Sequence, residues 1–513
     1  MQARLTDRSP LRSGSFGFEY NPFTLLTKYA KKKGGAEGIS PNYSYVDFHR
    51  SKIHEMDHWI AFNSTSIGNL FSLMLFTRAR TVVNLLWESS QKARNAVVAS
   101  RFNRGRPLIA LRDDGSLSPE SFTDNPEEFH PLCQIWHDHL VGFNMLYSSS
   151  LQDHIDLPRG AVIGEVMGDA ILYATEEVGL SSNPGTKIAR GLYAQDETPF
   201  LFHCGQRLTT RLMFEALATA NEVMSLRSYS LGSKIGIKGC ELEPHIEDLA
   251  GEQGLSGGYG LAIQMICDIA GAVGLESICP VLYLALNPPV PPVVFPEDPV
   301  HWYDLYPPIR LLRIAKVVST VGKLGSFATP QVLKEYISKL ADAAELHDPN
   351  EFEPPATQLF DRFRCFDSIG PEWDAKEAKD HYRFLLWTQH NMWSQRDRAM
   401  PLLVNLGGCM SGPQSQQYAK EILNMDGEGA WLHPRIIWTE KDNLGHVGDT
   451  VRFGSWLMLS QADHYYLDDF ISGTGPFDLS PYPPSVRNDL LQLLEEHLTA
   501  LFMSASGEQP LNS

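Results

Sequence analysis

The chain has 513 residues, of which 43% are hydrophobic and 20% charged, a composition typical of a globular protein with a sizeable core. Asp and Glu number 61 against 43 Lys and Arg, so the formal net charge is −18. This negative surplus would repel a polyphosphate, and no Lys/Arg-rich stretch interleaved with aromatic residues offsets it. We therefore expect no nucleic acid among the partners.

The start of the chain lacks the apolar stretch of a signal peptide. Seven scattered cysteines form neither a disulfide framework nor a paired metal motif, which favours reduced thiols. The most apolar stretch, 261–286, is interrupted by Asp268 and Glu276, and it fits two core helices better than a membrane span. These observations predict a cytoplasmic protein that does not enter a membrane.

The first half of the chain has mostly helical periodicity, apart from a polar N-terminal arm at 1–20 and an acidic, proline-containing loop at 103–130. One predicted helix, 45–79, has an expected break at 63–68. In chain order, helices are predicted at 22–30, 45–79, 81–101, 132–146, 165–178 and 205–226.

The second half begins with a glycine-rich turn at 254–260 and a stiff connector at 287–308 that holds eight prolines. An acidic break at 347–357 predicts a boundary between a domain at 21–345 and a C-terminal domain or extension at 346–513. The segments 431–438 and 451–459 could include strands. Helices are predicted at 261–271, 309–320, 330–344, 374–397 and 485–502. The fold class is therefore mainly α, with α+β as the alternative.

One short pattern, His-Glu-x-x-His, names a chemistry directly, and it falls at His54, Glu55 and His58. In a helix the two histidines stand one turn apart on the same face, where both can bind one Zn²⁺. Glu55 is then placed to accept a proton from water at the metal and to pass it to the leaving group. Asp57 argues against this interpretation, because zinc-peptidase helices usually leave that position uncharged, unless it serves to orient an imidazole.

The residues after His58 resemble those of a group of largely uncharacterised bacterial HExxH proteins in the zincin-like superfamily. In that group an aromatic, an aliphatic and usually a Gln are followed by a Ser-Thr-x-x-Gly turn. Ser64, Thr65 and Gly68 match this turn, whereas Ala61 stands where the Gln would be.

A later helix of the form Glu-x-x-Ala-x-x-x-Glu, preceded by a glycine, is also similar to that group and falls at 215–222, with Gly205 upstream. The resemblance implies a zincin-like helical catalytic core, in which Glu215 supplies the third zinc ligand. Glu222, two turns further along, is the alternative ligand or a partner of the ligands.

A peptidase also needs a donor that stabilises the oxyanion of its tetrahedral intermediate. The candidates are Tyr259 in the glycine-rich turn, and Tyr306 and Arg310 in Tyr-Pro-Pro-Ile-Arg. This last segment is similar to the His-Pro-Pro…Arg segment that follows the ligand helix in some zinc peptidases, with Tyr306 in place of the His.

Together these patterns predict a zinc-dependent metallopeptidase acting on a protein or peptide substrate. A non-catalytic interaction or regulatory protein, with an incidental or degenerate motif, is the alternative. A carboxylate-rich iron site on a helix bundle would need a second Glu-x-x-His, which occurs only at 127–130.

Overall fold

The fold is known from a computed structural model, which describes part of the chain. Side chains are described for most of these positions, but not at 18–21, 26–29, 41–49, 51–52, 110–111, 117–118, 227–232, 302–303, 435–440 or 443–447. The described residues are 18–21, 26–29, 41–74, 110–111, 117–118, 143, 146–147, 201–232, 258–290, 292–294, 302–325, 328–352, 389, 392–394, 396–409, 435–440 and 443–447.

Helical residues make up 77% of this described part, so the fold is mainly α, as predicted. Several predictions lie outside the described residues, namely the helices at 81–101, 165–178 and 485–502, the strand at 451–459, and most of the helices at 132–146 and 374–397.

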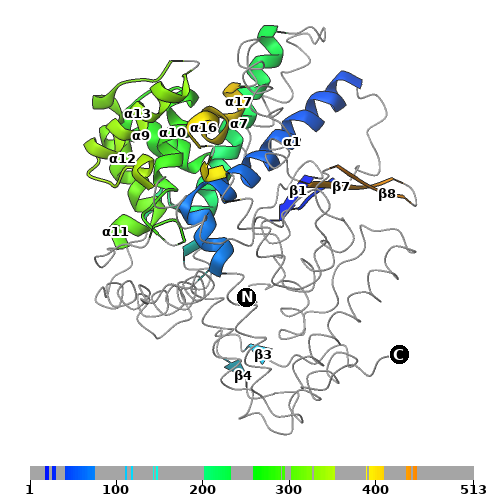
Figure 1. Cartoon of the computed structure of the whole chain (residues 1–513), viewed down its shortest axis with the longest axis horizontal. Coiled ribbons are helices and arrows are strands. Elements are labelled where there is room, and N and C mark those ends of the chain that lie inside the picture. Colours follow the sequence, from blue (N-terminus) through cyan, green and yellow to red (C-terminus); the bar gives the residue numbers. More distant parts are fainter. Residues whose placement is uncertain are drawn as a thin grey trace.

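Two long helices, α1 (Pro41–Ser64) and α7 (Thr210–Gly232), pack against each other at the centre of the described part (Figure 1). Part of their contact is apolar, and the rings of Phe62 and Phe214 lie 5.1 Å apart. Polar side chains of both helices meet along the rest of the contact. The helix predicted at 205–226 therefore exists, but it begins only at Thr210, after a short hairpin.

The predicted break in the helix at 45–79 is confirmed, because α1 ends at Ser64 and helical structure resumes at 66–74. Thr65 makes the turn: its hydroxyl donates to the carbonyl of Ala61 at 2.6 Å and accepts from the amide of Gly68 at 3.2 Å. A Cβ on Gly68 would lie 2.4 Å from the carbonyl oxygen of Phe62, so the turn requires glycine there.

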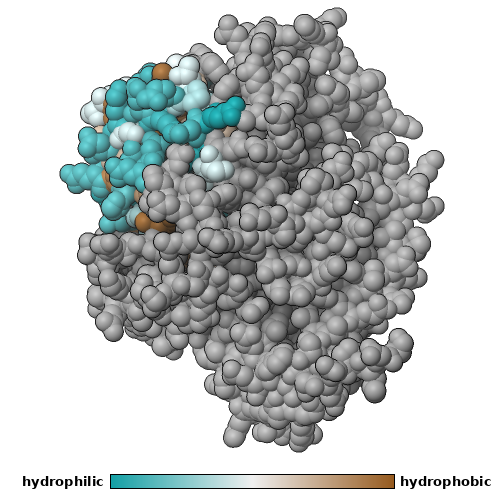
Figure 2. Space-filling model, in the orientation of Figure 1, coloured by the Kyte–Doolittle hydropathy of each residue, from teal (hydrophilic) through white to brown (hydrophobic). Residues whose placement is uncertain are grey.

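A group of helices covers one side of α1 and α7, to the left in Figure 1. It confirms the helices predicted at 261–271, 309–320 and 330–344. Figure 2 shows that the described outer face of the group is mainly hydrophilic. The members are η2 (Gly258–Gly260), α9 (Leu261–Ala270), α10 (Leu275–Ala285), α11 (Trp302–Leu305), α12 (Pro307–Val321), α13 (Pro330–Ala343) and η3 (Pro349–Phe352).

Within the described ranges, no single helix has the length and apolarity needed to cross a membrane. Only the segments Gly258–Ala270 and Leu275–Ala285 taken together reach that length and composition, and they are bent by 107° relative to each other.

Helices from the predicted C-terminal region, α16 (Arg396–Val404) and α17 (Leu406–Cys409), pack on α13, α1 and α7. A Cβ on Gly407 would lie 1.9 Å from the carbonyl oxygen of Asn221, so α17 meets α7 at backbone distance. Trp393 is buried and donates its indole N–H to Asn69 at 2.9 Å. The buried hydrophobic residues described between 352 and 409 therefore belong to the same hydrophobic core as the region that precedes them.

A four-stranded sheet lies on the other side of α1 and joins the two ends of the described chain (Figure 1). Its order is β1 (Phe18–Asn21), β2 (Leu26–Tyr29), β7 (Arg435–Glu440) and β8 (Asn443–Val447), with β2 parallel to β7 and the other pairs antiparallel.

The sheet confirms strand structure within 431–438, and it shows that the helix predicted at 22–30 is wrong. A window that short fits either state, and the ladder with β7 from the far end of the chain decides it. A small hairpin, β3 (Ala110–Leu111) with β4 (Leu117–Ser118), also interrupts the predicted loop at 103–130.

Candidate metal centre

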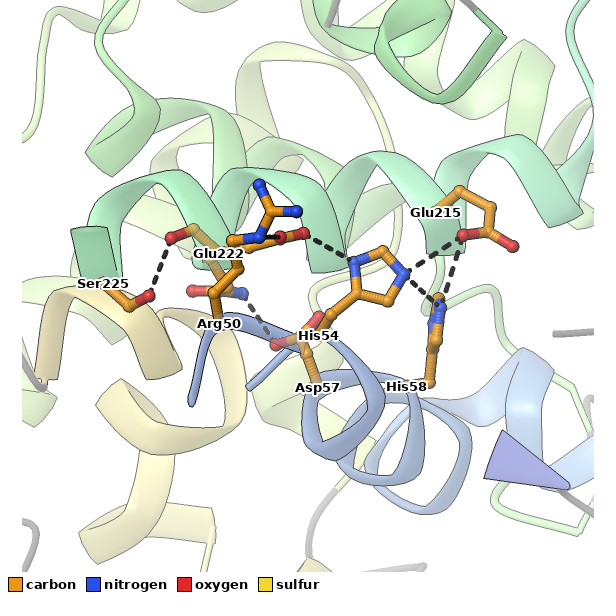
Figure 3. A network of polar contacts seen from close by, with 8 residues as sticks. Arg50, His54, Asp57, His58, Glu215, Glu222 and Ser225 are labelled. Atoms are coloured by element: carbon orange, nitrogen blue, oxygen red, sulfur yellow. Dashed lines mark hydrogen bonds and ion pairs between the residues drawn. The ribbon is translucent and has the colours of Figure 1, made fainter. Parts of the chain in front are cut away.

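Helix α1 presents His54 and His58 on one face, one turn apart, toward α7 (Figure 3). Their rings stand at right angles with centroids 4.7 Å apart, so the two Nε2 atoms converge to 3.1 Å. Both side chains are buried, with at most 5% of either residue exposed. The helical spacing that the sequence predicted thus points both imidazoles at one spot.

Helix α7 brings Glu215 to the same spot (Figure 3). Its Oε2 lies 3.4 Å from Nε2 of His54 and 3.4 Å from Nε2 of His58, and the residue is completely buried. The three atoms come from two helices, and Glu215 is 157 positions beyond His58 in the chain (215 − 58), so the fold and not a local turn brings them together.

The triangle of donor atoms has the dimensions of a zinc site. Bonds from Zn²⁺ to imidazole nitrogen or carboxylate oxygen are about 2.0–2.1 Å, and tetrahedral angles then separate the donor atoms by about 3.3–3.4 Å. The observed separations are 3.1, 3.4 and 3.4 Å. His54, His58 and Glu215 therefore fit one ion without rearrangement, and three protein ligands leave the fourth position open, as catalytic sites require.

The carboxylate of Glu215 lies close to the two imidazoles but has no hydrogen-bond donor of good geometry among the described residues. Neither of its oxygens accepts a hydrogen bond from the described residues, although both are buried. A buried carboxylate without hydrogen bonds is costly, and such groups are usually paired or bound to a metal. Nδ1 of His58 likewise has no hydrogen-bond partner among the described residues.

Two of the three residues favour the protonation state that a metal needs. Burial lowers the pKa of His58, which favours the neutral imidazole, although Glu215 opposes this shift. For Glu215 burial alone would raise the pKa, but His58 and His54 outweigh it and hold the value at about 2. At neutral pH Glu215 is therefore a carboxylate, facing an imidazole with a free lone pair.

The third residue, His54, has a carboxylate on each side. Its Nδ1 lies 3.1 Å from Oε2 of Glu222, while Oε1 of Glu222 lies 3.1 Å from Nε of Arg50 (Figure 3). Burial alone would lower the pKa of His54, yet the carboxylates of Glu215 and Glu222 hold it well above its usual range. A metal ion would have to displace the proton from Nε2 of His54, and a proton that stays on Nδ1, donated to Glu222, would then leave the Nε2 lone pair directed at the other two donor atoms.

The structure thus separates the two glutamates of α7. Glu215 lies with the Nε2 atoms, whereas Glu222 lies on the opposite edge of the His54 ring and is outside the group of three ligand atoms. The contacts of Glu222 are with Nδ1 of His54 and with Arg50, the arrangement expected for the second of its two predicted roles.

Glu55 lies on α1, between the two histidines in the sequence, and it is completely buried.

Asp57, the residue that argued against a metal site, faces α7 away from the three ligand atoms. It accepts a hydrogen bond from Nδ2 of Asn221 at 2.7 Å, and Oδ1 of Asn221 accepts from the amide of Gly407 at 2.9 Å. Burial raises the pKa of Asp57 to about 8, against opposing effects of His54 and Asn221.

Asp57 therefore contributes to the packing contact between α1, α7 and α17 and does not lie beside the three ligand atoms. The sequence held no signal for this chain of contacts, since Asp57, Asn221 and Gly407 are far apart in the chain and none of them belongs to a motif that links it to the others.

Of the predicted oxyanion donors, Arg310 is fully engaged elsewhere. Its guanidinium is buried and donates to four backbone carbonyls at 2.9–3.1 Å, those of Leu284, Ala285, Asn287 and Asp304. Three of them lie at the C-terminal end of α10, where a cation is favourable. Burial lowers the pKa of Arg310 to about 9, so it stays charged at neutral pH.

The two tyrosines also belong to turns and caps. Tyr306 is 1% exposed and precedes α12, where its carbonyl accepts from the amides of Ile309 and Arg310. Tyr259 is half-buried in η2, which packs on α7. Glu127 and His130, the second half of the alternative iron site, lie outside the described residues.

Comparison of the chain with models of protein families, with curated proteins and with solved structures finds no significant match. The function is therefore argued from the residues of the site.

Proposed function

We propose that this protein is a zinc-dependent hydrolase of peptide or amide bonds, with a centre of the zincin-like kind. His54, His58 and Glu215 would hold the ion. The single observation that carries the proposal is the convergence of their three donor atoms to 3.1–3.4 Å inside a buried core. Coincidence is a poor explanation, because the HExxH pattern and the glutamate come from separate helices and meet with zinc-site dimensions.

Bound zinc would supply Lewis acidity that polarises a substrate carbonyl and acidifies water. Glu55, next to His54 on the same buried helix, would take the proton of the attacking water on its carboxylate. It would then hand that proton to the leaving nitrogen, which must be protonated before the amide bond can break. Glu222 would keep the proton of His54 on Nδ1 throughout, so that Nε2 stays a ligand.

A metal-free alternative has a specific observation in its favour. The pKa of His54 is held well above its usual range, and a protonated His54 would bridge Glu215 and Glu222 as a closed ionic network. In that case the three side chains would stabilise the α1–α7 contact of a non-catalytic protein. The two readings differ in one measurable property, which is metal content.

The test is a metal count on the purified full chain, stripped with a chelator and reloaded with Zn²⁺. His54→Ala should lose one zinc per chain relative to the wild type. His347→Ala is the matched control, because His347 is an exposed histidine in a different part of the fold, and its zinc content should equal that of the wild type. Equal zinc in the wild type and in His54→Ala would refute the proposed centre.

Catalysis is tested separately with a quenched fluorogenic peptide library. Glu55→Gln should keep its zinc and lose cleavage, whereas Glu351→Gln, which changes an exposed glutamate, should keep both. Zinc binding without any cleavage by the wild type would leave a metal centre but reject the peptidase function.

A further inference from the structure

A second group of metal-ligand side chains lies on the surface, at the hairpin β5 (Phe202–His203) and β6 (Gln206–Arg207) that leads into α7. Cys204 and Gly205 form its two-residue loop and both have positive φ, 49° and 75°, as a tight hairpin turn requires. The turn places the side chain of Cys204 beside that of His203, the last residue of the strand.

The third member of the group comes from another element. Asp268 lies near the end of α9, and its Oδ2 is 3.0 Å from Nε2 of His203. One ligand atom from each of His203, Cys204 and Asp268 falls within 4.8 Å of the other two. Cys204 and Asp268 are exposed and His203 is half-buried, so an ion could enter from solvent.

An imidazole nitrogen, a thiolate sulfur and a carboxylate oxygen are the three donor types that Zn²⁺ prefers. Around one zinc these atoms would lie about 3.3–3.6 Å apart, since bonds are about 2.3 Å to sulfur and about 2.0–2.1 Å to nitrogen and oxygen. Rotation of the exposed Cys204 and Asp268 side chains would close the remaining gap.

We propose that His203, Cys204 and Asp268 form a second binding site for a thiophilic divalent metal ion, of which Zn²⁺ is the best match. The site takes its fourth ligand from water. It is chemically distinct from the buried centre, because it contains a sulfur ligand and faces solvent. Its existence does not depend on the function proposed above.

Such an ion would fasten the hairpin to α9. The hairpin runs directly into α7, the helix that carries Glu215, and α9 packs against α7. Without metal, the hairpin is held by the contact of His203 with Asp268 and by its own short ladder. Zinc at this site would therefore stabilise the N-terminal end of α7, the helix that would supply Glu215 to the buried centre.

Cobalt distinguishes the two sites, because Co²⁺ bound to a thiolate gives a near-ultraviolet charge-transfer band that nitrogen and oxygen ligands do not give. The full chain is stripped with a chelator under reducing conditions and titrated with Co²⁺. We expect the wild type to show the band and Cys204→Ser to lose it. Cys267→Ser is the matched control, since Cys267 is the neighbour of Asp268 but is outside the group, and it should keep the band.

His54→Ala should also keep the band, so failure of the buried centre and failure of this site are separable. Asp268→Asn should raise the Co²⁺ concentration that is needed to develop the band, whereas Asp342→Asn, a change at another exposed aspartate, should not. The proposal is overturned if the wild type shows no band, if Cys204→Ser retains it, or if the intensity of the band per chain rises with protein concentration, which would indicate a metal bridge between two chains.

Discussion

Two completely buried ionic groups in this fold are satisfied in opposite ways. Arg310 donates to four backbone carbonyls at 2.9–3.1 Å and closes the end of α10. Glu215 accepts no hydrogen bond from the described residues, and its carboxylate faces two imidazoles. A buried charge with all its partners is explained by the fold alone, whereas one that lacks them indicates a ligand.

Four predictions probe this contrast, and the largest effect concerns catalysis. Glu55→Gln should lower cleavage of a peptide substrate by about 10²–10⁴-fold, the range that general acid–base catalysis contributes. The amide is of nearly the same size, so zinc content and the unfolding transition should stay close to those of the wild type. Steady-state kinetics together with metal analysis would check this, and unchanged turnover would exclude Glu55 as the base.

The second prediction concerns the satisfied group. Arg310→Leu should lower the free energy of unfolding by at least about 3 kcal/mol, because each buried acceptor left without a donor costs about 1–3 kcal/mol. Chemical denaturation would measure the loss. Arg313→Leu, on the same helix but only half-buried, is the matched control and should cost less than about 1 kcal/mol.

The folded fraction of Arg310→Leu should still bind zinc at the buried centre, because Arg310 acts on α10 and not on the ligands. If this variant were as stable as the wild type but inactive, Arg310 would instead serve the reaction, as the sequence had suggested.

The third prediction concerns the orientation of His54. Glu222→Gln keeps an oxygen for the Nδ1 proton but removes the charge that also faces Arg50. Zinc affinity should fall about 10-fold, at the lower end of the effect typical for groups that hold metal ligands. Competition with a zinc chelator would measure it. An affinity loss as large as that of Glu215→Ala would mean that Glu222 is itself a ligand.

The smallest effect is expected at Asp57, as a change in pH dependence. Its pKa is raised to about 8 from an ordinary value of 3.8, so the folded protein keeps a proton that the unfolded chain releases. Its contribution to stability therefore falls as pH rises between these two values. Asp57→Asn cannot ionise and can still accept from Asn221, so it should remove this slope.

Melting temperatures at pH 5 and pH 8 would reveal the effect. Relative to the wild type, Asp57→Asn should gain about 2–4 °C more at pH 8 than at pH 5, because the ordinary and the raised pKa of Asp57 bracket this range. Asp342→Asn, at an exposed position, should give no such difference. If the melting temperatures of Asp57→Asn and of Asp342→Asn fell by the same amount between pH 5 and pH 8, Asp57 would be ionised in the folded state.

The sequence predicted those parts of the site that are encoded locally. The spacing of His54 and His58 defines one helical face, and Thr65 with Gly68 marks the turn that ends α1. Glu215 was nominated only through a resemblance, because nothing within its own helix says which distant residue it faces. Geometry now supports the same residue on independent grounds.

Contacts between segments that are distant in the chain could not be predicted from the sequence. The strand at Leu26–Tyr29 forms because β7 lies beside it, and a window of nine residues holds no trace of that partner. Arg310 was nominated as an oxyanion donor because sequence cannot show which carbonyls a buried guanidinium has already taken. The chain of hydrogen bonds that links Asp57, Asn221 and Gly407 was not predicted, for the same reason.

The most direct test is a zinc titration of the chelator-stripped full chain in a Cys204→Ser background, with and without Glu215→Ala. Cys204→Ser removes the sulfur ligand of the surface site, so the buried centre is measured alone. We predict one tightly bound zinc per chain with Glu215 present and a loss of that zinc, or at least a 100-fold weaker affinity, with Glu215→Ala. Equal zinc binding by the two proteins would contradict a metal centre formed by His54, His58 and Glu215.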